Sequence, residues 1–244
     1  NYNIYKSDSK DTTTSSESAS LKLENIQISN SQLVYNDKST KILIEAKGFN
    51  YKGKGDLQAS NFNLKTSAKI DSLSFTYDKK EYLKSKKVKA DLITKINTNS
   101  LSFIFEQNDL KINNLLVDFK GKFDFLKDGY NMDFILKTTN SNLNDLFTAF
   151  PPKFITWLDK TDLKGKTDFL LTLKGNYIAS ENVAPALNLD LKIRDGFVNY
   201  NKSTTPVTNL NLDFATKLPS LNPDLLIVDL KNLSLNIGKD YLKA

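Results

Sequence analysis

The sequence predicts an all-β protein, mostly antiparallel, whose strands form an extended curled sheet or groove with two short helices inserted. From Leu21 onward, apolar residues recur at every second position, the spacing that sends successive side chains to opposite faces of a strand. The residues between them are mainly Lys, Asp, Asn, Thr and Ser, so one face of each strand is apolar and the other polar. Helical spacing interrupts this pattern once, near residues 142–159.

The clearest strands lie in the middle and the last third of the chain. Parallel strands covered by helices would instead be apolar almost throughout, so antiparallel hairpins are the better interpretation. Asp and Gly at Lys127-Asp-Gly129 and Arg194-Asp-Gly196 predict tight turns, because both residue types tolerate turn backbone conformations. The alternating apolar positions are Leu101, Phe103, Phe105, Val117, Phe119, Phe123, Phe125, Tyr130, Met132, Phe134, Leu136, Phe169, Leu171, Leu173, Leu187, Leu189, Leu191, Ile193, Leu210, Leu212 and Phe214.

The interruption at residues 142–159 predicts the two helices. Apolar residues from Leu143 to Phe150 follow the i, i+3, i+4, i+7 spacing of one helix face, and the proline pair at 151 and 152 ends that helix. We expect the insertion to plug one end of the sheet or, alternatively, to act as a mobile gate or touch a membrane. The residues assigned to this gate or cap are Leu146, Phe147, Phe150, Phe154 and Trp157.

Two parts of the chain are expected. Residues 1–20 predict a flexible polar linker, since their Ser, Thr and Asp run cannot bury enough apolar surface to offset its ordering entropy. Residues 21–244 predict a single β domain that contains the helical insertion. Because the chain begins with Asn1 and not with Met, we expect a piece of a longer protein whose membrane anchor has been removed.

The composition argues against most catalytic chemistry. The chain has no Cys and no His, which removes thiol nucleophiles, imidazole bases and the commonest ligands of zinc and copper. Acidic residues such as Asp118, Asp124 and Asp133 alternate with apolar neighbours, which predicts a solvated face and not a carboxylate pair for acid and base catalysis. We therefore expect no enzyme activity, no metal site and no cofactor.

The charge distribution argues against nucleic acid as a partner. The formal net charge is +6, but the Lys residues are spread along nearly every segment instead of forming one patch. Arg194 is the only Arg in the sequence, although Arg is the usual residue for recognising bases and phosphates. General attraction to an anionic membrane surface remains compatible with this charge.

Four segments resemble patterns of the AsmA family of bacterial envelope proteins. Residues 108–123 are similar to the family's pattern in which an Ile-Asn-x-Leu strand runs into x-Phe-x-Gly, and residues 163–175 are similar to its spaced-glycine strand. Residues 23–37 and 191–200 look like its recurring strand-turn-strand element. Together with their order along the chain, these segments extend the resemblance over most of residues 21–244.

The resemblance implies a periplasmic protein anchored in the inner membrane of a diderm bacterium, with strands curled into an apolar groove. It implies a role in lipid movement and outer-membrane homeostasis, with phospholipid or another acyl lipid as the ligand and the membrane surface reached through the anchor. The family offers no catalytic residues to carry over. The residues we assign to the lipid groove are Phe103, Phe105, Val117, Phe119, Phe123, Phe125, Met132, Phe134, Phe169, Leu171 and Leu173.

One rival architecture stays open at this point. In a closed β-sandwich the same apolar face would pack against a second layer and leave no groove, and a period of two residues fits both cases. Such a module would bind an envelope protein partner, for example during outer-membrane protein assembly.

Overall fold

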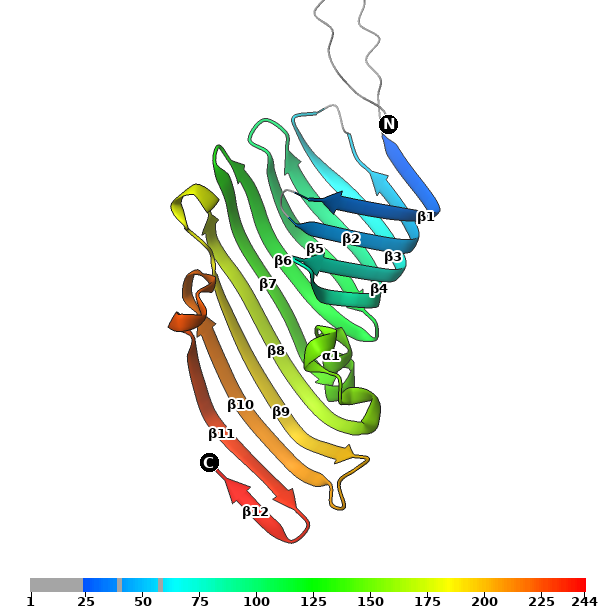
Figure 1. Cartoon of the computed structure of the whole chain (residues 1–244). Helices are drawn as coiled ribbons and strands as arrows, with labels where there is room; N and C mark the ends of the chain where they lie inside the picture. The colour runs from blue at the N-terminus through cyan, green and yellow to red at the C-terminus, as the bar shows by residue number, and fades with distance from the viewer. Residues whose placement is uncertain (1–23, 39–40, 57–58) are drawn as a thin grey trace, which may run out of the picture.

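The computed structural model describes residues 24–38, 41–56 and 59–244, apart from the side chains of residues 107, 108 and 154. The expected linker at residues 1–20 lies outside these residues. The described chain forms one 12-stranded sheet in which the strands follow sequence order (Figure 1). Every neighbouring pair is antiparallel, which confirms the predicted fold class.

The strands are long, and all but the last have 11 to 18 residues. Alternating apolar residues and short polar loops produce this meander, because consecutive strands can pair without any crossover. The bounds are β1 Asn25–Asp37, β2 Ile42–Lys54, β3 Asn61–Tyr77, β4 Lys80–Asn97, β5 Ser102–Ile112, β6 Leu115–Leu126, β7 Gly129–Asn142, β8 Thr161–Tyr177, β9 Ala186–Tyr200, β10 Val207–Leu218, β11 Ile227–Ile237 and β12 Asp240–Lys243.

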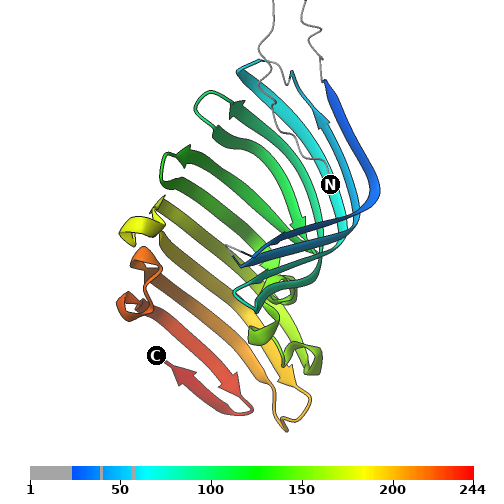
Figure 2. The same cartoon turned by 45° about the horizontal axis from the view of Figure 1, so that its top comes forward.

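The sheet bends sharply across its first four strands. Asn30, Gly48 and Ser85 adopt left-handed backbone conformations with φ of 42°, 63° and 48°, and the pairing of β3 with β4 shifts after Ile70. Such bulges bend a strand and increase its twist. On one side of these bulges, β1 to β4 fold toward the face of the sheet that carries the helix α1, Leu143–Ala149 (Figures 1 and 2).

The helical insertion differs from the prediction in its second half. One α-helix forms, α1 Leu143–Ala149, but the expected second helix is wrong: the chain makes two 3₁₀ turns there, Pro152–Phe154 and Leu158–Lys160. The proline pair removes two backbone donors, and only eight residues lie between it and β8, which leaves room for isolated turns. Three further 3₁₀ turns lie at Ala179–Glu181, Pro219–Leu221 and Pro223–Leu225.

The two predicted turns have different outcomes. Lys127 and Asp128 connect β6 to β7 as a tight hairpin, as predicted. The expected turn at residues 194–196 is wrong, because these residues lie inside β9, where Asp195 has a φ of 50°. Asn30 occupies the corresponding place inside β1. A single left-handed residue bulges a strand without reversing it, so the two segments expected as strand-turn-strand elements each lie within one long bulged strand.

The core lies where α1 meets the sheet. Leu143 and Leu146 are each only 1% exposed. Leu146 packs with Leu115 and Val117 of β6, while Leu143 packs with residues of β8 and β9. The insertion therefore covers one end of the apolar face of the sheet.

An ion pair on the other face joins the bulges of three neighbouring strands. Arg194 of β9 donates two hydrogen bonds to the carboxylate of Asp168 in β8, and the backbone N–H of Asn140 in β7 donates a third at 2.7 Å. These hydrogen bonds, with that from Arg194 as the largest contribution, lower the pKa of Asp168 from 3.8 to about 2. These hydrogen bonds link β7, β8 and β9 next to the insertion.

Acid should weaken the fold through Asp168. Its pKa is lowered by folding, so its contribution is complete above the unfolded value of 3.8 and is lost as the pH falls toward about 2. With allowance for solvent screening, Asp168→Asn should cost about 1 kcal/mol of unfolding free energy at pH 7 and much less at pH 2.5. Urea unfolding followed by circular dichroism measures this, with Asp118→Asn as the surface control. An equal loss at both pH values would contradict the assignment.

Leu146 should contribute strongly to stability. Leu146→Ala removes a side chain that is fully enclosed between α1 and β6, and should lower the unfolding free energy by about 2–4 kcal/mol. The matched control is Leu116→Ala, because Leu116 lies in the same strand region but is 68% exposed. Chemical denaturation of both variants tests this, and a similar small loss in each would show that the insertion is not packed as described.

Candidate functional site

All eleven predicted groove residues lie on one face of the sheet, which we call the inner face because α1 lies on it (Figure 1). Cross-strand register aligns residues of consecutive strands in rows across this face. In one row, Phe103 lies opposite Phe123, which lies opposite Met132. In another, Phe134 lies opposite Leu173. Sequence alternation predicted the shared face, and the structure supplies the rows.

Eight aromatic rings form a continuous group on the inner face of β5 to β8, which we call the aromatic cluster. Neighbouring ring centroids lie 5.1 to 6.4 Å apart, within the range of favourable aromatic contacts. Its members are Phe103, Phe105, Phe119, Phe123, Phe125, Tyr130, Phe134 and Tyr177.

Two members of the aromatic cluster were missed as groove residues. Tyr130 precedes Met132 in the alternation of β7, and Tyr177 continues the alternation of β8 two positions beyond Gly175. Their rings stack at 6.4 Å across the β7–β8 pair. Extending the period of two residues to the strand ends would have found both.

Gly121 of β6 leaves space in which the ring of Phe134 packs. It continues the alternating positions between Phe119 and Phe123, and a Cβ atom there would lie 2.4 Å from Cδ1 of Phe134. The missing side chain therefore provides the space that the Phe134 ring fills. This close approach explains a glycine in the middle of an otherwise aromatic row.

The exposure of the inner face increases away from α1. Phe125 is 44% exposed and Tyr130 is 38% exposed, whereas Val117, beneath Leu146, is 6% exposed. No second sheet covers this face in the part of the chain that the structure describes. The two-sheet form of the closed sandwich is thus not seen among the described residues, and the end of the inner face at Phe125 and Tyr130 is exposed to solvent.

Two assigned groove residues belong to the covered end. Val117 contacts the core around Leu146, and Phe169 lies 6.1 Å from the ring of Phe150. The other nine assigned groove residues lie beside the insertion or farther from it. The exposed part of the inner face therefore lies at the aromatic cluster, where Phe125, Tyr130 and Tyr177 are 38–44% exposed.

The assigned cap residues meet at the insertion. The Phe147 ring lies 5.4 Å from Phe150 and 5.3 Å from Trp157, while Leu146 is buried against β6. The side chain of Phe154 lies outside the described residues. These positions suit a cap over one end of the inner face, and movement of the insertion as a gate stays a prediction.

Polar contacts hold α1 at its last turn. The backbone carbonyl of Thr148 accepts hydrogen bonds from Nζ of Lys86 in β4 and from Nδ2 of Asn113, the latter at 2.9 Å. A cation suits a helix C-terminus because the last carbonyl groups carry partial negative charge. Burial lowers the pKa of Lys86. The hydrogen bond from Lys86 thus joins the bend of β4 to the insertion.

The opposite face of the sheet is polar and carries ion pairs. Lys122 lies 2.8 Å from Asp124, and Lys174 lies 2.7 Å from Asp133. These carboxylates therefore have basic partners on a solvated surface, and they do not converge on a site. Among the described residues, no group of three His, Cys, Asp or Glu is arranged to hold a metal ion.

Within the same residues, no helix has the length and apolarity needed to cross a membrane. Comparison of the chain with protein-family models, curated proteins and solved structures gives no match.

Proposed function

We propose that this chain is a non-catalytic protein of the bacterial cell envelope that binds the acyl chains of phospholipid, or of another acyl lipid, at its aromatic cluster. The observation that carries the proposal is the group of eight rings on a face that no second sheet covers. Leaving such rings in water is unfavourable, because apolar burial contributes about 25 cal/mol per Å². Acyl chains would cover them without requiring hydrogen-bond partners.

The shape of the inner face also supports a lipid ligand. The aromatic cluster spans β5 to β8 and borders further apolar rows on β9 and β10, including Leu189 and Phe214. An elongated apolar strip matches a flexible acyl chain better than a compact polar metabolite. We propose that the headgroup stays at the open end, near Phe125 and Tyr130.

The cellular setting of the proposal comes from the resemblance to AsmA-family sequences. We propose that the chain acts in the periplasm, attached to the inner membrane through a segment outside this sequence, and takes part in lipid transfer and outer-membrane homeostasis. The basic net charge of +6 suits contact with anionic membrane surfaces. No nucleic acid partner is proposed.

A protein-binding role is the second candidate. At the β11 edge, Leu226, Ile227 and Val228 are each more than half exposed. Exposed edge strands can pair with a strand of another protein, such as an envelope protein during outer-membrane assembly. Lysine substitutions at these three residues would weaken such a partner's binding and leave lipid binding at the aromatic cluster intact.

Two acidic substitutions within the aromatic cluster should abolish lipid binding. Phe119→Asp combined with Phe134→Asp places two carboxylates where acyl chains would lie, and lipid retained per protein should fall at least fivefold, because burying an unpaired charge is costly. The measurement is lipid extraction and mass spectrometry of protein isolated from a diderm bacterium, with circular dichroism to verify the fold. The matched control is Ile104→Asp with Ile135→Asp, on the opposite face of β5 and β7.

A milder pair separates lost binding from lost folding. Phe125→Asp with Tyr130→Asp changes the most exposed end of the cluster, where the fold tolerates polarity best. Folded protein with reduced lipid would support the proposal. The proposal would be overturned if either inner-face double variant folds and retains as much lipid as the control variant with Ile104→Asp and Ile135→Asp.

A further inference from the structure

The sheet opens between β6 and β7 at the end nearest α1. Their pairing ends at Asp118 opposite Lys137. Beyond this point, Leu115–Val117 pair with β5, and the end of β7 pairs with β8, but the two segments do not pair with each other. We call this opening the seam, bounded by residues 115–117 and 138–142. Each segment thus has a strand neighbour on one side.

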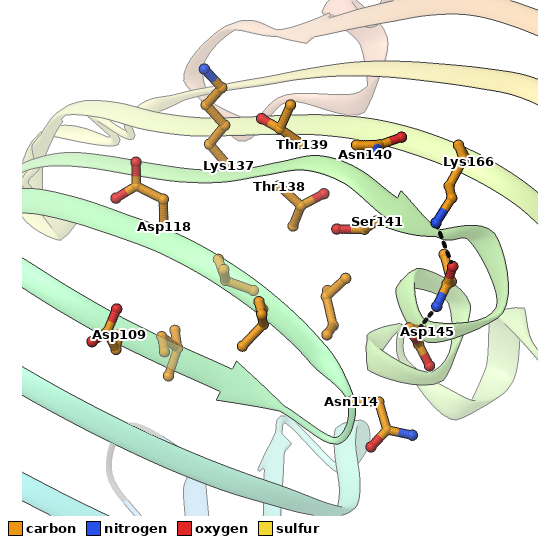
Figure 3. A pocket seen from close by; sticks show the side chains of 15 residues that line it. Asp109, Asn114, Asp118, Lys137, Thr138, Thr139, Asn140, Ser141, Asp145 and Lys166 are labelled. Carbon is orange, nitrogen blue, oxygen red and sulfur yellow. Dashed lines mark hydrogen bonds between the residues drawn. The ribbon is translucent and has the colours of Figure 1, made fainter.

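A cavity of about 670 Å³ occupies the seam, a volume typical of ligand sites (Figure 3). Its apolar wall includes Leu115 and Val117, which rest on Leu146 of α1. Its outer wall includes Leu116, the most exposed large apolar residue of the described chain at 68%. The site is therefore apolar toward α1 and open toward solvent.

Polar groups line both ends of the seam. Asp118 and Lys137 lie at one end. At the other end, Lys166 donates to Asn142 at 3.0 Å and Asn142 donates to Asp145 at 3.1 Å (Figure 3). With charges of both signs present, the seam has no preference for a strongly charged ligand.

Thr138 lacks a hydrogen-bond partner in the seam. The residue is 3% exposed, and its Oγ1 atom is buried without a partner. Figure 3 shows the Thr138 and Ser141 side chains between the two diverging strands. A buried hydroxyl without a hydrogen bond is unfavourable by about 1–3 kcal/mol, so a ligand that supplies a polar group here gains an interaction that the free chain lacks.

We propose that the seam binds an extended peptide segment, which adds as a short strand between β6 and β7. Backbone N–H and C=O groups are the partners that two separated strand edges require, and a peptide can offer them on both sides. It could also supply the hydrogen bond to Thr138. An acyl chain offers none of these groups. The favoured segment alternates, with small apolar side chains toward Leu115 and Val117 and polar side chains toward solvent.

This site is separate from the aromatic cluster, so its test is independent of lipid binding. The probe is a fluorescein-labelled nine-residue peptide of alternating Val and Thr with blocked termini, used with the full chain. The control peptide has the same sequence with alternate backbone nitrogens methylated, which removes donors needed for strand pairing. Fluorescence anisotropy measures affinity, and hydrogen exchange with mass spectrometry locates protection.

The expected result is binding of the unmethylated peptide with protection of residues 115–117 and 138–142. Thr138→Val keeps the side-chain shape and should weaken binding about five- to tenfold, the effect of one lost hydrogen bond. Thr94→Val, at another buried threonine away from the seam, should leave affinity unchanged. Circular dichroism should show the same fold in both variants.

Four results would overturn the proposal. They are no binding, equal binding of the methylated peptide, protection confined to the outer edges at β1 or β11, and protection of the seam by phosphatidylglycerol vesicles but not by peptide. The last result would make the seam a lipid site. Loss of lipid binding in the Phe119 and Phe134 variant with normal peptide binding would support two separate sites.

Discussion

The structure depends on one constraint: a single antiparallel sheet gathers its alternating apolar side chains on one face, and few elements are available to cover that face. The only α-helix of the described residues, α1, has seven residues and covers one end of the inner face. The remaining apolar rows gain part of their burial from one another, through ring contacts such as Phe119 with Phe134 at 5.8 Å. An accessible aromatic surface is the consequence.

The bulges and the insertion together shape this surface. Left-handed residues such as Asn30 and Ser85 bend the first strands toward α1, and Lys86 then reaches the Thr148 carbonyl at the end of the helix. On the opposite face, Arg194 and Asp168 join the bulged parts of β8 and β9. The same region contains the seam, because α1 fills the inner side of the gap between β6 and β7. The packed core and the seam therefore both depend on one small insertion.

Local pattern predicted the face of each strand but not the arrangement of the strands in space. Phe123 and Phe134 could be assigned to one face because side chains alternate along a strand. Their stacking at 6.2 Å depends on register, which requires knowledge of both strands. Asp195 looked like part of a turn because a left-handed residue suits both a turn and a bulge, and only the neighbouring strands distinguish them.

The seam has no signature in the local sequence. Thr138 continues the alternation of β7, so nothing in its pattern indicates a partnerless hydroxyl beside a cavity. The seam arises because the start of β6 pairs only with β5 and the end of β7 pairs only with β8. Which strands pair there depends on several strands at once, so no short segment of sequence predicts it. The second predicted helix failed for a simpler reason, since the proline pair left too few residues for one.

Lipid binding by the inner face is tested most directly by native mass spectrometry of the unmodified chain after expression in the periplasm of a diderm bacterium. An unrelated β protein of similar charge, isolated in the same mild detergent, provides the baseline. We expect stoichiometric phospholipid on this chain alone, held by the aromatic cluster. Lipid-free protein that unfolds cooperatively would contradict lipid binding and show that the inner face is stable without a lipid ligand.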